Sequence, residues 1–173
     1  MKTPLRSVLA PALALAVSLP TFADTASADS GPYIGAKLGR LDIDIGADVE
    51  DPSMKGFILG YNFGSWAVEL ERNSGDGSIT PPFGGSSIDF DIDTTAAYLA
   101  YRSAGDAYFK FKAGWLEEEI EVPDEDEDIK ESDTGFSAGI GVGFRGEIFR
   151  LELEVTRVEE DAILLGVGLM AQF

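Results

Sequence analysis

Two residue types that carry much of enzyme and metal chemistry are absent from this chain of 173 residues, which contains neither cysteine nor histidine. Without cysteine the chain can form no disulfide, no thiolate metal site and no lipid anchor on a cysteine. Without histidine it lacks the commonest general base and metal ligand. We therefore predict that the protein is not an enzyme, with no catalytic residue, no cofactor and no metal site built on these ligands.

Basic residues are also scarce, since 13 Lys and Arg stand against 31 Asp and Glu, a net charge of -18. Nucleic-acid binding needs a basic surface, so this class of partner is excluded. A hydrophobic content of 45% argues against long disordered segments. The length fits one domain.

The amino-terminal residues 1–23 are typical of a secretory signal peptide. Lys2 and Arg6 supply a charged start, an apolar run covers 8–19, and 21–23 offers small residues at the cleavage positions. A second cleavage position follows Ala28. An uncleaved membrane helix is disfavoured because the run is short. The predicted organisation is a signal peptide over 1–23, a short segment over 24–30 and one β-domain over 31–173.

No later apolar run approaches the roughly 20 residues that a membrane helix needs. Instead, apolar residues alternate with other residues. The pattern is clearest at the carboxy-terminus, where every second residue is apolar and most of the others are small. The apolar positions there are Ile163, Leu165, Val167, Leu169, Ala171 and Phe173. Similar patterns predict eight strands, over 32–41, 54–63, 66–74, 88–102, 107–118, 134–145, 147–158 and 162–173.

The connections between these strands fall into two classes. They are tight at 64–65, 103–106 and 145–147, and long and polar at 42–53, 75–87 and 119–133. The last one, 159–161, is short and acidic. Short turns on one side and longer loops on the other are typical of outer-membrane β-barrels. A soluble ligand-binding barrel is the alternative, but it would bury its apolar face inward.

The chemistry of the two strand faces favours the membrane barrel. Over 147–158, Leu151 and Leu153 alternate with Glu152 and Glu154, and other strands oppose bulky apolar residues with glycine and charge. A soluble core could not be filled with glycines and bare charges, whereas a narrow membrane barrel needs small and mutually paired polar residues inside. We therefore predict an all-β fold, an eight-stranded antiparallel up-and-down transmembrane β-barrel.

Aromatic residues gather near the turn-side strand ends, which resembles an interfacial girdle. They are Phe63, Trp66, Tyr101, Tyr108, Phe109, Phe144, Phe149 and Phe173. The strand over 88–102 leaves its parity open, since Phe90 and Ile92 alternate with acids while Leu99 and Tyr101 have the opposite phase. Either a bulge changes which residues of this strand face outward, or the part that contains Phe90 and Ile92 lies above the membrane.

From about Gly31 to Phe173 the chain resembles the small eight-stranded outer-membrane β-barrel family of the OmpA, OmpX and opacity-protein type. The segments that carry the resemblance are 31–39, 56–61, 68–71, 136–144 and 162–173. The resemblance implies location in the Gram-negative outer membrane, reached through the periplasm, and assembly by the barrel-assembly machinery with Phe173 in the assembly signal. Related barrels that act on lipid A use a histidine, which this chain lacks.

Charged residues on the inward faces predict an ion-pair cluster in the lumen. Its members are Lys37, Glu69, Glu71, Lys110, Lys112, Arg145, Arg150, Glu152 and Glu154. Opposite charges in a narrow, partly dry interior should pair, since an unpaired buried charge is costly. We favour a salt-bridged plug that holds the barrel shut. The alternative is a gate whose rearrangement opens a small conductance path.

Four basic residues on the outward parity are expected near the external end, namely Arg40, Lys55, Arg72 and Arg157. They could bind lipopolysaccharide phosphates or extend to the membrane interface, and ordinary surface charge is an equal alternative. The acidic segment 117–128 is best interpreted as a solvated, repulsive surface. Its carboxylates could also bind Ca²⁺ or Mg²⁺ weakly.

The sequence thus predicts a monomeric cell-envelope protein with four surface loops, both termini of the barrel in the periplasm, and a structural or surface-interaction role. A narrow, porin-like channel for small or hydrophobic solutes is the alternative function.

Overall fold

The computed structural model describes residues 30–43, 48–80, 88–122, 129–158 and 162–173. No helix in this part of the chain is long and apolar enough to cross a membrane. Its strands are β1 (Ser30–Ile43), β2 (Asp48–Phe63), β3 (Trp66–Thr80), β4 (Ile88–Arg102), β5 (Ala107–Val122), β6 (Ile129–Arg145), β7 (Phe149–Arg157) and β8 (Ala162–Gln172). The predicted signal peptide over 1–23 lies outside the described residues.

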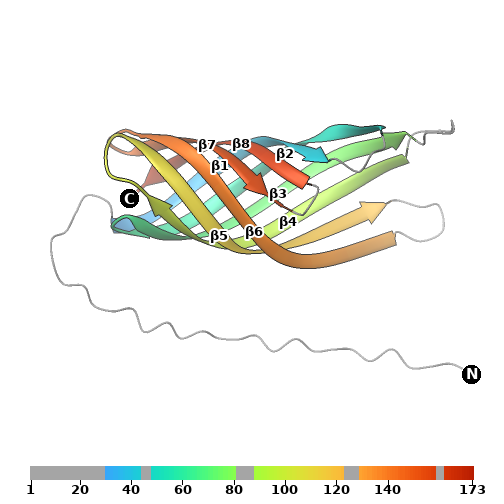
Figure 1. The fold of residues 1–173 in the computed structure, drawn as a ribbon, viewed down its shortest axis with the longest axis horizontal. Helices are drawn as coiled ribbons and strands as arrows, with labels where there is room; N and C mark the ends of the chain where they lie inside the picture. Colours follow the sequence, from blue (N-terminus) through green and yellow to red (C-terminus); the bar gives the residue numbers. More distant parts are fainter. Residues whose placement is uncertain (1–29, 44–47, 81–87, 123–128, 159–161) are drawn as a thin grey trace, which may run out of the picture.

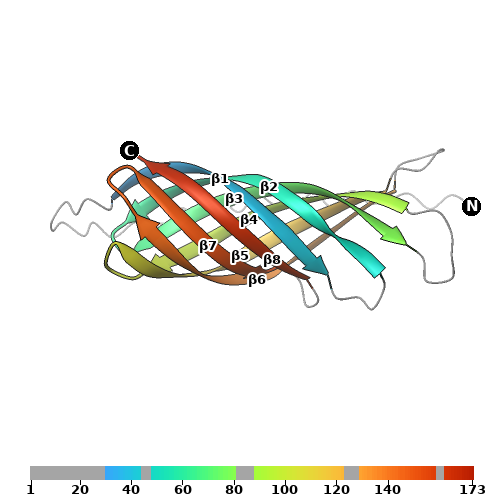
Figure 2. The same cartoon turned by 90° about the horizontal axis from the view of Figure 1, so that it is seen from above.

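Each strand pairs antiparallel with the next, and β8 returns to pair with β1, so the sheet closes into a barrel (Figures 1 and 2). The predicted eight-stranded antiparallel barrel is confirmed. Short turns join β2 to β3, β4 to β5 and β6 to β7 at one end, which we call the turn end. Gly64 and Gly105 occupy two of these turns with φ of +76° and +112°, values that favour glycine. The opposite end is the loop end.

Most strands run further toward the loop end than the sequence indicated. The expected long loops over 42–53, 75–87 and 119–133 are therefore wrong in extent, since β1, β2, β3, β5 and β6 extend into them. In these stretches the outer face of each strand is polar. A sequence searched for apolar outward positions therefore shows no strand pattern there, and the stretches resemble loops. At the turn end β7 begins at Phe149, because the amide of Gly146 donates to the Phe149 carbonyl (2.7 Å) and closes the turn.

The alternation of side chains follows the pleat around the barrel. Along β8 the residues Ile163, Leu165, Val167 and Leu169 point outward and are about half exposed, while Met170 is buried inside. The same outward apolar band continues over the other strands, as the sequence predicts.

Strand β4 keeps one parity from end to end, and its pairing with β3 and β5 shows no register shift. Phe90, Ile92 and Arg102 all point inward, while Asp91 and Leu99 point outward. The predicted alternative of a bulge in this strand is therefore wrong. What changes along the strand is the chemistry of its faces, which becomes acidic outside and apolar inside toward the loop end.

The apolar inner residues at the loop end pack into a single cluster, which we call the loop-end cluster. Its members are Leu41, Met54, Phe90, Ile92, Ala96, Tyr98, Leu116, Val158, Ala162 and Leu164. They come from β1, β2, β4, β5, β8 and the end of β7. In this half the barrel is built as a water-soluble protein would be, with its apolar side chains inside.

Candidate functional site: the charged lumen

Alternation on β1, β3, β5 and β7 places charged side chains inside the turn half of the barrel. Lys37, Glu69, Glu71 and Lys110 are all at most 3% exposed. Glycines on neighbouring strands leave the room that these long side chains occupy. A Cβ built on Gly166 would lie 2.7 Å from Cε of Lys37, a separation that real Cβ atoms do not show. The glycine-and-charge pattern thus has a packing cause.

Glu154 and Glu71 form the layer nearer the loop end. The carboxylate of Glu154 lies 2.8 Å from Nζ of Lys37 and 3.0 Å from Nζ of Lys112, and it also contacts Lys110. Glu71 shares two of these ammonium groups, at 2.9 Å from Lys37 and 2.6 Å from Lys112. Each carboxylate thus bridges lysines from strands on opposite sides of the lumen.

Glu69 and Glu152 form the second layer, nearer the turn end. Lys110 lies 2.9 Å from Glu69 and 2.7 Å from Glu152. Arg102 donates through Nε to Glu152 (2.7 Å) and also pairs with Glu69. The hydroxyls of Tyr33 and Tyr108 donate to Glu69 (2.6 Å) and Glu152 (2.7 Å), so neutral donors complete the shell of both carboxylates.

Together these residues form what we call the lumen network, in which four cations face four carboxylates. The members are Lys37, Arg102, Lys110, Lys112, Glu69, Glu71, Glu152 and Glu154. Balanced charge and multiple hydrogen bonds are the conditions under which ions can be held away from water.

Two predicted cluster members, Arg145 and Arg150, lie at the turn end of the lumen as cross-strand partners. The buried Arg150 donates to Oδ1 of Asn62 (3.1 Å). Arg145 is half-buried, with its guanidinium carbon 5.2 Å from the ring centre of Tyr108. These two arginines therefore extend the polar interior beyond the lumen network.

Sequence reasoning missed Arg102, and it placed Tyr108 in the aromatic girdle, which is wrong because Tyr108 is 3% exposed and points inward. Tyr108 could have been placed inside from the alternation of the strand, because it lies on the same strand face as Lys110 and Lys112. The phase of Arg102 follows from Tyr98 and Ala100 once β4 is known to be regular. The other proposed girdle residues lie on the outward side, and Trp66 packs edge-on against Tyr101 at 5.1 Å.

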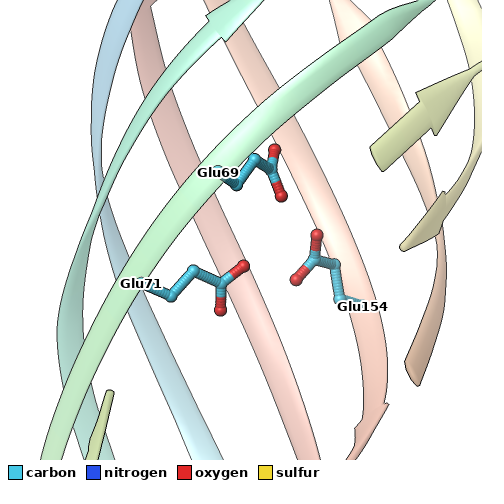
Figure 3. A group of neighbouring side chains, drawn as sticks. All are labelled: Glu69, Glu71 and Glu154. Atoms are coloured by element: carbon cyan, nitrogen blue, oxygen red, sulfur yellow. The ribbon is translucent and has the colours of Figure 1, made fainter. Parts of the chain in front are cut away.

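Glu69, Glu71 and Glu154 point toward one another from β3 and β7, with one carboxylate oxygen from each within 4.8 Å of the others (Figure 3). Carboxylate oxygens are ligands that Ca²⁺ and Mg²⁺ prefer. Here Lys37, Lys110 and Lys112 already approach these oxygens. The protein's own ammonium groups thus supply the positive charge at this position.

The four predicted rim residues, Arg40, Lys55, Arg72 and Arg157, are all exposed on the outward side. Their surroundings differ. Arg72 lies 3.6 Å from Asp93 on β4, beside a sheet face that bears further acids. Arg40 and Arg157 flank β8, opposite the apolar residues Leu165 and Ile163.

The acidic segment 117–128 lies partly within the described strands. Glu117 and Glu119 point outward on β5, whereas Glu118 is buried on the inner side. Residues 123–128 lie outside the described residues, so the predicted weak divalent-cation site there stays a prediction.

A closed eight-stranded barrel with an apolar outer band, a charged interior and short turns at one end defines an outer-membrane β-barrel. The model of the outer membrane protein beta-barrel domain family matches residues 9–161, and the chain belongs to this family. It is a small protein of the Gram-negative outer membrane with a buried salt-bridge network inside its barrel.

Solved structures of similar architecture show the same fold. Neisserial surface protein A matches with a TM-score of 0.64 at 13% identity, covering 87% of this chain and 100% of that one. OprG from Pseudomonas aeruginosa gives 0.58 at 13% identity, with 84% and 98% covered. Ail, the attachment invasion locus protein of Yersinia pestis, gives 0.55 at 18% identity, with 83% and 96% covered. No curated protein matches the sequence.

Proposed function

We propose that this chain is a non-enzymatic outer-membrane protein with a structural or surface-interaction role, whose lumen is closed to ions. The observation that carries the proposal is the filling of the lumen by two successive layers of different chemistry. The lumen network occupies the turn half, and the loop-end cluster occupies the other half.

The two layers close the barrel in complementary ways. An ion entering the turn half meets ammonium and carboxylate groups that already satisfy one another at 2.6 to 3.0 Å. An ion that passed this layer would meet buried Phe90, Ile92 and Leu116, which offer no ligand. A gate that only rearranged the ion pairs would still leave the apolar layer closed.

The non-enzymatic part of the proposal rests on the side chains available. The sequence has no histidine or cysteine. The buried carboxylates Glu69, Glu71, Glu152 and Glu154 each contact cations of the network, so none stands ready as an isolated general acid or base.

Planar-bilayer recording of the purified protein tests the closed barrel. We expect no steady conductance from the wild type, and none from Glu71→Gln either, because the loop-end cluster is intact in that variant. A small, stable conductance in the wild type would overturn the closed barrel and favour the alternative function, a narrow outer-membrane channel. Conductance that appears only in Glu71→Gln would favour the gate.

We also infer that the rim contacts lipopolysaccharide through residues that include Arg40 and Arg157. Both lie beside apolar outward residues of β8, where a phosphate above the acyl chains would be within reach. The test is the shift in melting temperature when lipopolysaccharide is added to micelles. Arg40→Ala should reduce this shift, and an unchanged shift in Arg40→Ala would contradict the inference.

The remaining expectations are proposals of the same kind. The protein is monomeric, it is delivered after removal of residues 1–23, and Phe173 acts in recognition by the barrel-assembly machinery. Fractionation of cells expressing Phe173→Ala tests the last of these, because the variant should accumulate in the periplasm if the terminal aromatic residue is recognised.

A further inference from the structure

The inward charges in the turn half of the barrel do not balance. The lumen network matches four cations with four carboxylates. Arg145 and Arg150 point into the same interior closer to the turn end, and they add two more cations. Among the described residues, the lumen of the turn half therefore has an excess of two positive charges. In a chain with a net charge of -18, this makes the turn end of the lumen a local exception.

Three guanidinium groups converge there. Arg145 and Arg150 are direct partners in the last described pair of the β6–β7 ladder. Arg102 and Arg150 both donate through Nη1 to the same acceptor, which is Oδ1 of Asn62, at 3.3 and 3.1 Å. Like charges that face each other across strands are destabilising. We call these three arginines and Asn62 the turn-end site, because they crowd positive charge into one small volume.

Aromatic rings help to hold the guanidiniums in place. The guanidinium carbon of Arg145 lies 5.2 Å from the ring centre of Tyr108. That of Arg102 lies 5.3 Å from the ring centre of Tyr33. Gly143 makes room for one of these rings, since a Cβ there would lie 2.3 Å from Cζ of Tyr108. A cation over a ring face is stabilised by the charge distribution of the ring. The arginines are thus positioned before a ligand arrives, which lowers the entropy cost of binding one.

The turn-end site can be approached from the turn end of the barrel. Arg102 and Arg150 are 2% and 3% exposed, whereas Arg145 is half-buried and directly precedes a turn. The turns span 64–65, 103–106 and 146–148, too few residues to fold across the end of the barrel. In outer-membrane barrels the short turns face the periplasm. A ligand from that side would therefore meet Arg145 first and Arg150 behind it.

The chemistry of the site favours a doubly charged oxyanion. A guanidinium presents a planar fork of N–H donors that matches the oxygens of a phosphate. One phosphate dianion also balances an excess of two positive charges. The acidic groups of the chain at this end, on Asp106, Glu147 and the terminal Phe173, belong to exposed residues, so water and salt screen their charge. An anion beside the buried Arg150 would balance the excess more strongly than they do.

We propose that the turn-end site binds a phosphate group from the periplasmic side of the barrel. Arg145 and Arg150 donate to its oxygens, and Arg102 adds positive charge from the lumen network. Free inorganic phosphate and the headgroup phosphate of a phospholipid share this chemistry. The inference goes beyond the proposed function and does not depend on it. Conductance reports on the closed lumen alone, so a conducting barrel that still binds phosphate would refute the proposed function and leave this site standing.

The test is titration calorimetry of the mature protein with inorganic phosphate. The protein is held in micelles of a maltoside detergent, which has no phosphate, and chloride keeps the ionic strength constant. We expect the wild type to bind phosphate and to melt at a higher temperature when phosphate is present. Arg145→Gln should bind at least tenfold more weakly, because it loses a charged fork of donors. A wild type that shows neither heat nor a rise in melting temperature would overturn the proposal.

The matched control is Glu147→Gln, which removes a charge from an exposed residue of the adjacent turn. It should leave phosphate binding within twofold or strengthen it slightly. Equal binding by the wild type and Arg145→Gln would overturn the proposal, because phosphate would then bind elsewhere on the barrel. If Arg145→Gln does not fold, as judged by the band shift on heating, Arg145→Lys decides. It keeps the charge but not the fork, so it should weaken binding severalfold, and equal binding would contradict the forked contact.

A competition experiment distinguishes the two sources of phosphate. Phosphatidic acid is added to the micelles, with diacylglycerol as the matched lipid that has no phosphate. If phosphatidic acid alone weakens the binding of inorganic phosphate tenfold or more, and does so through Arg145, the source is a lipid headgroup. If neither lipid competes, the source is soluble phosphate.

The chain itself supplies a competing occupant that the same assay can detect. Residues 24–29 lie outside the described residues, but they precede Ser30 at the turn end and contain Asp24 and Asp29. We expect a variant with both Asp24→Asn and Asp29→Asn to bind phosphate as the wild type does. Phosphate binding that appears only in this variant would make the segment the occupant and overturn the proposal.

Discussion

Removing the charge of Glu154 should test whether the remaining carboxylates of the lumen network can pair with its ammonium groups. Glu154 contacts the ammonium groups of Lys37, Lys110 and Lys112. Deleting one partner of a buried ion pair costs about 3–5 kcal/mol. A simple sum over three contacts would exceed that range severalfold. The sum is inappropriate here, because every ammonium keeps another carboxylate, with Glu71 at 2.9 Å from Lys37 and 2.6 Å from Lys112.

We therefore expect Glu154→Gln to lower the free energy of unfolding by about 3 kcal/mol, at the low end of the range. Glu71→Gln should cost a similar amount, since Glu154 remains beside the same two lysines. In the double variant, with both Glu71→Gln and Glu154→Gln, no carboxylate can compensate for the other. Lys37 and Lys112 then lose every carboxylate contact within the lumen network. Its cost should exceed the sum of the two single costs by about 1–3 kcal/mol.

The assay is urea-induced unfolding in phospholipid vesicles, followed by tryptophan fluorescence and checked by the band shift between unboiled and boiled samples. Glu117→Gln, on the outer surface of β5, is the control and should change the free energy of unfolding by no more than about 0.5 kcal/mol. Additive costs for Glu71→Gln and Glu154→Gln would refute the shared network, because the two carboxylates would then act independently. Subadditive costs would refute the expectation that each carboxylate compensates for the loss of the other.

Three other predictions concern packing and surface charge, all measured by the same unfolding assay. Ile92→Ala should cost about 2–4 kcal/mol, because Ile92 is 2% exposed in the loop-end cluster. Asp91→Asn should instead stabilise the protein by a few tenths of a kcal/mol, and more at low salt, because Asp91 faces acids on both neighbouring strands. Gly166→Ala should cost about 1–3 kcal/mol, because the added methyl group would meet the side chain of Lys37; a stability equal to the wild type would show that Lys37 can move aside.

The outward band and the closing strand were predictable because each rests on a period of two over many residues. At the carboxy-terminus every second residue from Ile163 to Phe173 is apolar, and a one-residue slip would turn this whole set inward. The strand count followed from the same rule and from the tight turns around Gly64 and Gly105.

The loop half was less predictable for a physical reason. Above the apolar band the surroundings change from lipid to water, so the favoured inward and outward chemistry exchange while the pleat does not. Asp91 and Ile92 therefore obey the same geometry as Leu99 and Tyr98 with the opposite polarity. A search for apolar outward positions stops where the polarity changes, and this is why the strands toward 80 and 122 were predicted too short.

The residues of the lumen network were easier to predict than the contacts between them. The sequence indicated which strand faces carry Lys37, Glu71 and Glu154, but not which lysine each carboxylate meets across the lumen. That pairing depends on barrel closure and on the register of distant strands. Arg102 shows the same limit, because its inward direction depended on the regularity of β4.

The contact between Lys37 and Glu154 joins residues 117 positions apart in the chain, one on the first strand and one on the seventh. Such a contact cannot form in a partly closed sheet, because loop closure over that length must come first. Lys37 does not reach Glu154 until β1 has paired with β8. Pairing of β1 with β8 is thus the step that brings Lys37 to Glu154 and balances the charge of the lumen network, which makes completion of the barrel a cooperative event.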